Sequence, residues 1–252
     1  MTKTVFITGA TSGIGKATAE VFAQNGWDLI IVGRRGKRLY DLQDHLRKAY
    51  KNEVDVLSFD VRNLAEVKEN LENIKDKLGR LDVLVNNAGL AAGFDRIQDG
   101  KTEDWDTMID TNIKGLLYIT KQIVPYFIER GKGQIINIAS TAAKVVYEKG
   151  NVYCATKFAV DALSKSMRID LLPHGIKVTQ VSPGAAETEF SMVRFKGDKD
   201  LAKKTYEGYQ PLTGVDVASA IYYTATLPDH VCINELEITA LAQANSTHVF
   251  RK

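Results

Sequence analysis

Short apolar runs alternate with helical patterns along almost the whole chain. The runs have the length of strands and consist largely of Val, Ile and Leu, whereas the segments between them repeat apolar residues at helical spacing. Strands that are apolar throughout and alternate with helices indicate a parallel sheet that is buried on both faces. We therefore predict an α/β protein with a single doubly wound parallel sheet and helices on both faces.

The same pattern gives the expected elements. We expect strands at residues 3–8, 28–33, 55–61, 81–89, 133–140, 176–184 and 235–239. We expect helices at residues 15–26, 36–51, 63–78, 103–130, 152–172 and 215–227, with Pro125 bending the fourth of them. Ligands of such sheets bind beyond the carboxyl ends of the strands, so the residues that follow each strand are the first candidates for a site.

The size and charge of the chain limit the classes of protein that it can be. Its 252 residues, 44% hydrophobic and 25% charged, fit one large domain that spans residues 1–252. A net charge of +2 gives no reason to expect nucleic acid or an anionic membrane as a partner. The two cysteines form no CxxC motif and the four histidines are scattered, which favours a reducing compartment and no metal site. With no membrane span and no signal peptide in the pattern, we expect a cytoplasmic protein.

A glycine-rich stretch, "TGATSGIG" (8–15), lies between the first expected strand and the first expected helix. Glycines at positions 9, 13 and 15 allow a tight turn and a close approach of the backbone to a pyrophosphate. Free N–H groups at the helix start then face the phosphates. A plain tight turn is the alternative, and the strand-to-helix context favours the dinucleotide site.

Two arginines, Arg34 and Arg35, follow the second strand. Sites that prefer NAD usually place a carboxylate near this position to bind the ribose 2′-hydroxyl. Guanidinium groups instead pair well with a 2′-phosphate, which favours NADP. The alternative is that one of the arginines merely solvates a helix start.

Two further strand ends carry candidates for the same cofactor. Asp60, after the third strand, could accept a hydrogen bond from the adenine amino group, and it equally fits a carboxylate at a helix N-terminus. The stretch "NNAG" (86–89), after the fourth strand, suits a loop that lies flat against a cofactor and equally suits a plain turn.

The stretch "YCATK" (153–157) places a phenol and an ammonium one helical turn apart. A solvated helix surface is the default interpretation of such a pair. Ser140, at the preceding strand end, and the glycine loop favour an acid–base pair instead. A free tyrosine has a pKa near ~10, so work near pH 7 needs a shift of roughly 4 kcal/mol. One ammonium at ~4 Å in an effective dielectric of ~20 supplies about that much, and we expect Lys157 to do so for Tyr153.

The chain resembles the short-chain dehydrogenase/reductase family over nearly its whole length. The motifs that carry the resemblance occur in the family's order and spacing: "TGATSGIG" (8–15), "NNAG" (86–89), Asn112 in "DTNIKG", Ser140 in "INIAS", "YCATK" (153–157) and "SPG" (182–184). The resemblance implies a single Rossmann-fold domain that binds NADP (NADPH), assembled as a homotetramer.

By resemblance, the catalytic residues are Tyr153 as general acid–base, Lys157 as its activator, Ser140 as the hydroxyl that positions the carbonyl, and Asn112 as part of a proton relay. The cofactor-binding residues implied are Gly9, Ser12, Gly13, Ile14, Gly15, Arg34, Arg35, Asp60, Val61, Asn87, Ala88, Gly89, Tyr153, Lys157, Pro183, Gly184 and Thr188. Thr188 is expected to cap a helix and to contact the nicotinamide carboxamide. The spacing between Gly184 and Thr188 is longer than in many family members.

The segment after "SPG", residues 185–213, is the expected substrate lid, and we call it the lid segment. Ser140, Tyr153 and Arg194 are the expected substrate-binding residues. Arg194 would hold a substrate carboxylate through a two-pronged hydrogen bond, or else is a surface arginine. The stretch "TEFSMVRFKGD" (188–198) resembles the family branch that oxidises serine, allo-threonine and other 3-hydroxy acids such as 3-hydroxyisobutyrate with NADP, and that reduces malonic semialdehyde.

Two other functions stay open at this point. One is a 3-oxoacyl-carrier-protein reductase or another carbonyl reductase of the same family. The other is a non-catalytic NADP-binding scaffold or redox sensor, although that role predicts loss of Ser140, Tyr153 or Lys157, and all three are present. The tail, residues 240–252, is too polar for a core strand, and we expect it to be disordered or to pack on a neighbouring subunit.

Replacing both Arg34 and Arg35 with neutral residues should erase a preference for NADPH over NADH, because the 2′-phosphate then loses its guanidinium partners. Titration of the wild type and the double variant with both nucleotides tests this. Unchanged NADPH affinity in the double variant would sink the assignment.

Overall fold

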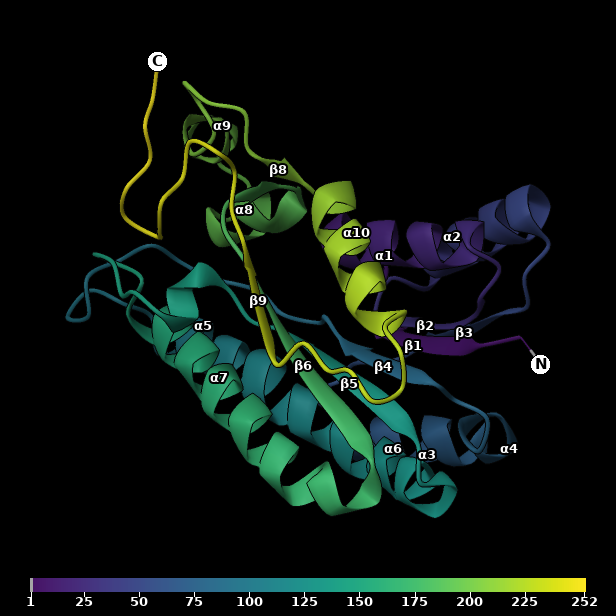
Figure 1. The fold of residues 1–252 in the computed structure, drawn as a ribbon. Coiled ribbons are helices and arrows are strands. Elements are labelled where there is room, and N and C mark those ends of the chain that lie inside the picture. Colours follow the sequence, from purple (N-terminus) through teal and green to yellow (C-terminus); the bar gives the residue numbers. More distant parts are fainter. Residues whose placement is uncertain (1) are drawn as a thin grey trace.

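A seven-stranded parallel sheet forms the centre of the computed structural model, which describes residues 2–252. The strand order is β3-β2-β1-β4-β5-β6-β9, and every neighbouring pair is parallel (Figure 1). The strands are β1 Thr4–Thr8, β2 Asp28–Gly33, β3 Val54–Ser58, β4 Val83–Asn86, β5 Gly133–Ile138, β6 Ile176–Pro183 and β9 Glu235–Ile238. The predicted doubly wound Rossmann sheet is confirmed. Its strand order reverses between β1 and β4, which is where such sheets bind ligands.

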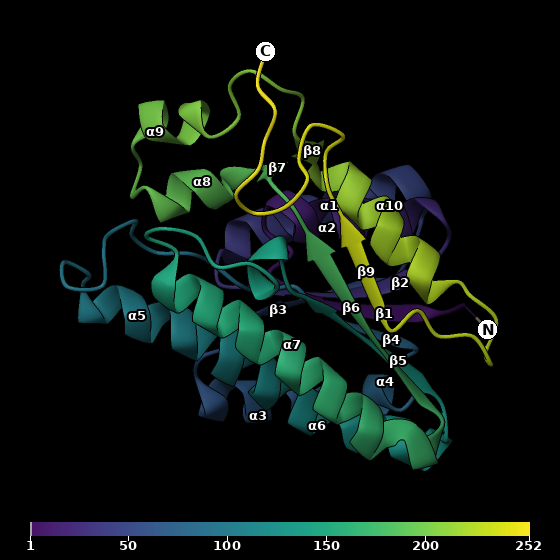
Figure 2. The same ribbon diagram turned by 60° about the vertical axis from the view of Figure 1, so that its left-hand side comes forward.

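Helices cover both faces of the sheet because each strand buries both of its faces. Alternate residues of β1 separate, so that Val5 and Ile7 join a core beneath α1, α2 and α10, while Phe6 joins a core on the other face beneath α3, α6 and α7. Figure 2 shows the two helical layers. The helices are α1 Gly13–Gln24, α2 Gly36–Tyr50, α3 Leu64–Glu72, α4 Lys75–Leu78, α5 Thr102–Ile109, α6 Leu116–Arg130, α7 Asn151–Leu171, α8 Glu189–Arg194, α9 Lys199–Lys204 and α10 Gly214–Ala225.

Two expected helices are each divided. The helix expected at 63–78 ends at Glu72, because the chain tightens into a three-residue turn in which Ile74 N donates to the Leu71 carbonyl, and α4 then starts afresh. The helix expected at 103–130 contains a π-helical turn, Asp110–Gly115, between α5 and α6. Pro125 lies inside α6 without ending it.

The lid segment lies beyond the carboxyl edge of the sheet, where Figure 1 shows α8 and α9 above the strand ends. It contains these two short helices and a two-stranded parallel pair, β7 Ala186–Glu187 with β8 Leu212–Thr213. No helix among residues 2–252 is both long enough and apolar enough to cross a membrane.

The tail differs from its prediction, because it packs on the lid segment of its own chain. Lys252 N donates to the Gly208 carbonyl at 2.8 Å, and Ala185 N donates to Gln243 Oε1 at 2.8 Å. Gln243 also forms an antiparallel bridge with Val249. The polar groups that exclude the tail from a core supply the hydrogen bonds that hold it to these loops.

Candidate active site

A cleft of about 740 Å³ opens at the carboxyl ends of the strands, beneath the lid segment. Its volume falls within the range of small-molecule and cofactor sites, roughly 300–1,000 Å³. Every residue predicted to bind cofactor or substrate lines this cleft. Of the predicted catalytic residues, only Asn112 lies outside it.

The glycine loop forms one wall of the cleft, and its geometry fits a dinucleotide. Gly9 and Gly13 have φ of +69° and +54°, a region that favours glycine. A Cβ on Gly15 would lie 2.4 Å from both Asn87 Nδ2 and the Gly9 carbonyl oxygen. The loop is therefore closed to side chains, and its backbone, with the start of α1 at Gly13, is left to face a phosphate.

The loop after β4 is fixed to the glycine loop by side-chain hydrogen bonds. Asn87 Nδ2 donates to the Thr8 carbonyl at 2.8 Å. The Thr8 hydroxyl accepts from the backbone of Asn87 at 3.0 Å and of Ala88 at 2.9 Å. These bonds hold "NNAG" flat beside the first helix, as expected for a cofactor wall.

Arg34 and Arg35 line the end of the cleft near β2 and β3. Arg34 lies 3.7 Å from the Asp60 carboxylate, which also pairs with Arg62 at 2.7 Å. Although burial raises the pKa of Asp60, hydrogen bonds from Arg62 and the charges of both arginines bring it below its ordinary value. The helix that follows is capped by Asn63 rather than by Asp60, so the capping role suggested for this carboxylate is wrong.

Tyr153 and Lys157 lie on the buried face of α7, with exposed fractions of 8% and 6%. Lys157 Nζ donates to the Ile138 carbonyl, at the end of β5, at 2.9 Å. Ser140 follows two residues later and caps a short turn, Thr141–Ala143, by accepting a hydrogen bond from Ala142 N. The three predicted catalytic side chains thus meet where α7 crosses the end of β5.

The predicted lowering of the pKa of Tyr153 by Lys157 is wrong for this arrangement. Burial raises the pKa of Tyr153 above its ordinary value, and the neighbouring Tyr147 adds to the rise. Ser140 and the charge of Arg194 act in the opposite direction. The Lys157 ammonium lies 5.9 Å from the centre of the phenol ring and is bonded elsewhere, so Tyr153 is held as the protonated acid at neutral pH.

Asn112 occupies the π-helical turn and is buried. Its Oδ1 accepts from Leu90 N at 2.9 Å, and its Nδ2 donates to the Leu90 carbonyl at 2.8 Å and to Thr156 Oγ1 at 3.0 Å. The side chain therefore joins the loop after β4 to α7. Its part in a proton relay stays a prediction.

Arg194, the last residue of α8, lies among three aromatic rings of the cleft. Its guanidinium carbon is 4.6 Å from the ring centre of Phe94, 5.2 Å from that of Tyr147 and 5.6 Å from that of Tyr153. Nη1 donates to the Tyr147 hydroxyl at 2.8 Å. Within residues 2–252, no acceptor bonds to its buried Nε. A guanidinium beside the predicted acid, with an unused donor, suits an anionic substrate group.

Tyr147 and Phe94 are site residues that the sequence did not identify. Both line the cleft, and both lie in loops without helical or strand periodicity, so no local pattern marks them. Phe190, whose ring edge packs on Tyr153 at 5.6 Å between ring centres, was missed for the same reason. Thr188 caps α8 as predicted, by accepting from Phe190 N.

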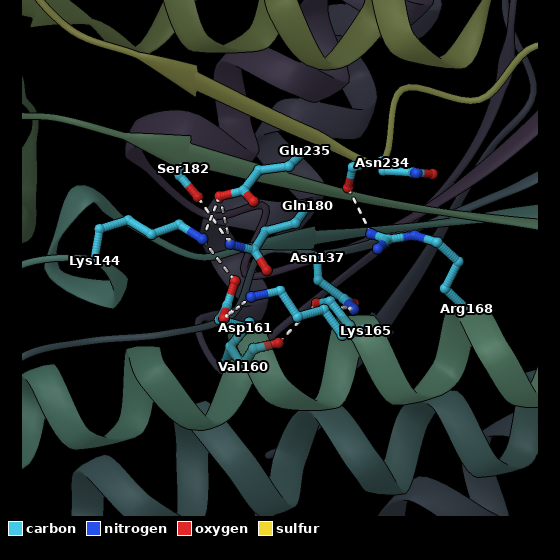
Figure 3. A network of polar contacts seen from close by, with 11 residues as sticks. Asn137, Lys144, Val160, Asp161, Lys165, Arg168, Gln180, Ser182, Asn234 and Glu235 are labelled. Carbon is cyan, nitrogen blue, oxygen red and sulfur yellow. Dashed lines mark hydrogen bonds and ion pairs between the residues drawn. The ribbon is translucent and has the colours of Figure 1, made fainter.

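A network of polar contacts braces the catalytic elements from behind (Figure 3). Lys144, which follows the Ser140 turn, pairs with Asp161 at 2.9 Å and with Glu235 on β9 at 2.6 Å. Asp161 lies on α7, one turn beyond Lys157, and also pairs with Lys165 at 2.6 Å. Because the Asp161 side chain is only 13% exposed, salt screens these pairs less than it screens surface pairs. The network fixes the Ser140 turn, α7 and β9 relative to one another.

Replacing Lys157 with Met should stabilise the protein at pH 7. Burial lowers the pKa of Lys157 from its ordinary 10.5 to about 8. Loss of that penalty, offset by loss of one hydrogen bond, predicts a gain of about 2 kcal/mol in the free energy of unfolding. The unfolded chain binds more protons between pH 8 and 10.5, so the wild type gains stability through this window and the difference should close.

Urea unfolding at pH 7 and at pH 10 measures this difference. An exposed lysine on α6, replaced in the variant Lys121→Met, serves as the control and should change stability little at either pH. A Lys157→Met variant that is less stable than the wild type at pH 7 would contradict the assignment of a buried, strained ammonium.

Known proteins resemble this chain in both sequence and structure. The family model for short chain dehydrogenases matches residues 3–199. An NADP-dependent 3-hydroxy acid dehydrogenase, YdfG of Salmonella typhi, is 45% identical over 95% of this chain and 96% of its own. Sulfoacetaldehyde reductase 2 of Chromohalobacter salexigens is 44% identical over 97% and 96%. The closed form of a serine dehydrogenase complexed with NADP+ superposes with a TM-score of 0.92 at 43% identity, over 99% of this chain and all of the other. The chain belongs to the short-chain dehydrogenase family.

Proposed function

We propose that the protein is an NADP-dependent oxidoreductase that acts on the 3-hydroxy group of small hydroxy acids, among them serine, allo-threonine and 3-hydroxyisobutyrate. In the reverse direction it would reduce semialdehydes such as malonic semialdehyde. The observation that carries this proposal is the Arg194 guanidinium 5.6 Å from the ring of Tyr153, within the same cleft as the glycine loop. The family resemblance supports a cytoplasmic homotetramer as its working form.

The residues around the cleft divide the cofactor between them. The glycine loop would hold the pyrophosphate, Arg34 and Arg35 the 2′-phosphate, and the loop at 86–89 with Pro183 and Gly184 the nicotinamide half. The bound nicotinamide supplies or accepts the hydride. Because Arg34 and Arg35 offer guanidinium donors where an NAD site usually offers a carboxylate, the pocket favours NADP.

Tyr153 would move the proton that accompanies the reaction. Its raised pKa keeps Oη protonated near pH 7, so that it can donate to the oxygen of a carbonyl substrate. The Ser140 hydroxyl would hold that oxygen while negative charge develops on it. Lys157, with a pKa of about 8, is charged on most molecules at pH 7 and places positive charge beneath the phenol ring.

Arg194 and Tyr147 would select the substrate. A carboxylate is the group that a guanidinium and a phenol hydroxyl can bind together, through charge-assisted hydrogen bonds. The names of two relatives agree with an anion at this position, because a 3-hydroxy acid carries a carboxylate and sulfoacetaldehyde a sulfonate. A neutral alcohol would leave the buried Nε of Arg194 without a partner.

Replacing Arg194 with Met should raise the KM for 3-hydroxy acids by about 10- to 100-fold, the value of one hydrogen bond between charged groups. The KM for neutral alcohols should change by less than about threefold, because those substrates make no such bond. Steady-state NADP reduction with serine, allo-threonine, 3-hydroxyisobutyrate and neutral secondary alcohols measures both values.

The matched control is Lys196→Met, which removes an exposed cation two residues away that pairs with Asp104 outside the cleft. It should leave the ratio of acid to alcohol unchanged. Equal losses for acids and neutral alcohols in the Arg194 variant would count against a carboxylate clamp. An acetoacetyl thioester that outperforms the hydroxy acids would favour a carrier-protein reductase.

A further inference from the structure

Glu189 is an acidic residue at the mouth of a cleft otherwise suited to anions. It is the first residue of α8 and follows the cap residue Thr188. Its carboxylate accepts from Arg35 Nη1 at 2.8 Å, and from Arg38 Nη1 at 2.7 Å and 3.0 Å. These two hydrogen bonds from arginine hold the pKa of Glu189 below its ordinary value, so the carboxylate is charged throughout the neutral range.

Arg35 connects this carboxylate to the glycine loop. Its Nε donates to Thr11 Oγ1 at 3.0 Å and its Nη2 donates to Ser12 Oγ at 2.7 Å, while Nη1 binds Glu189. One guanidinium therefore spans from the loop expected to hold the cofactor to the lid segment. Arg38, one helical turn further along α2, does not line the cleft and binds Glu189 from the outer side.

Helix α8 is short, and its two ends serve different parts of the cleft. Glu189 lies at its N-terminal end beside Arg35, and Arg194 lies at its C-terminal end beside Tyr153. The C-terminal end is also held, because Gly93 N donates to the Arg194 carbonyl at 3.1 Å and Lys196 pairs with Asp104 at 2.6 Å. Because so short a helix is nearly rigid, the contact made by Glu189 constrains the position of Arg194.

We propose that Glu189 is a positioning residue: clasped by Arg35 and Arg38, it fixes the N-terminal end of α8 and thereby places Arg194 beside Tyr153. The clasp links the arginines at the cofactor end of the cleft to the guanidinium at the substrate end. Its consequence for substrate binding rests on the proposed function of Arg194, whereas its consequence for the order of α8 does not.

The test combines hydrogen exchange with kinetics on the full chain. In Glu189→Gln the carboxylate charge is lost, so the amides of residues 190–195 should exchange about three- to tenfold faster, as expected for loss of two exposed ion pairs. Arg38→Gln should reproduce the faster exchange, because it removes the partner outside the cleft. In Glu189→Gln, the KM for 3-hydroxy acids should rise severalfold with kcat little changed, and the KM for neutral alcohols should stay constant.

Glu187→Gln is the matched control, since it removes the same charge from an exposed residue two positions earlier that does not line the cleft. It should alter neither exchange nor KM. Unchanged exchange at residues 190–195 in both Glu189→Gln and Arg38→Gln would overturn the proposal, and so would tighter NADPH binding as the only effect of Glu189→Gln. Exchange reports on α8 directly, so failure of the Arg194 clamp would be recognised separately.

Discussion

The hydrogen bond from Lys157 Nζ to the Ile138 carbonyl, 2.9 Å long, fixes the site on which the rest of the cleft depends. It joins α7 to the end of β5, so that Tyr153 from the helix and Ser140 from the strand end come together. The ion pairs of Lys144 with Asp161 and Glu235 brace the same junction from behind. A parallel sheet alone would bring these elements to one edge, and the buried ammonium sets their register.

That junction carries an electrostatic cost that follows from its function. Lys157 is almost fully buried without a carboxylate bonded to it, and its pKa falls accordingly. Tyr153 is buried beside it, and its pKa rises. The protein therefore holds an acid and a cation in an environment that favours the neutral form of both. Such tension is typical of sites at which charge develops during a reaction.

The sequence predicted the sheet, its order and most of the cleft, because those features depend on local patterns. Continuous apolar strands, the glycines at 9, 13 and 15, and the Tyr153–Lys157 spacing each have a physical meaning that can be recognised without contacts. The clasp of Glu189 with Arg35 and Arg38 joins residues about 150 positions apart, and no periodicity links them. The aromatic cage around Arg194 comes likewise from separate loops. The direction of the pKa shift of Tyr153 was wrong because burial cannot be weighed from spacing alone.

The central claim is that the Tyr153 phenol supplies the proton in this cleft while contributing little to cofactor binding. Single-turnover oxidation of NADPH with malonic semialdehyde, in the wild type and in Tyr153→Phe, measures this claim directly. The rate should fall by about 10²- to 10⁴-fold, the range for loss of a general acid, with the Kd for NADPH within about twofold of the wild type. A variant that turns over at a near-normal rate, or one that loses its cofactor, would contradict the account.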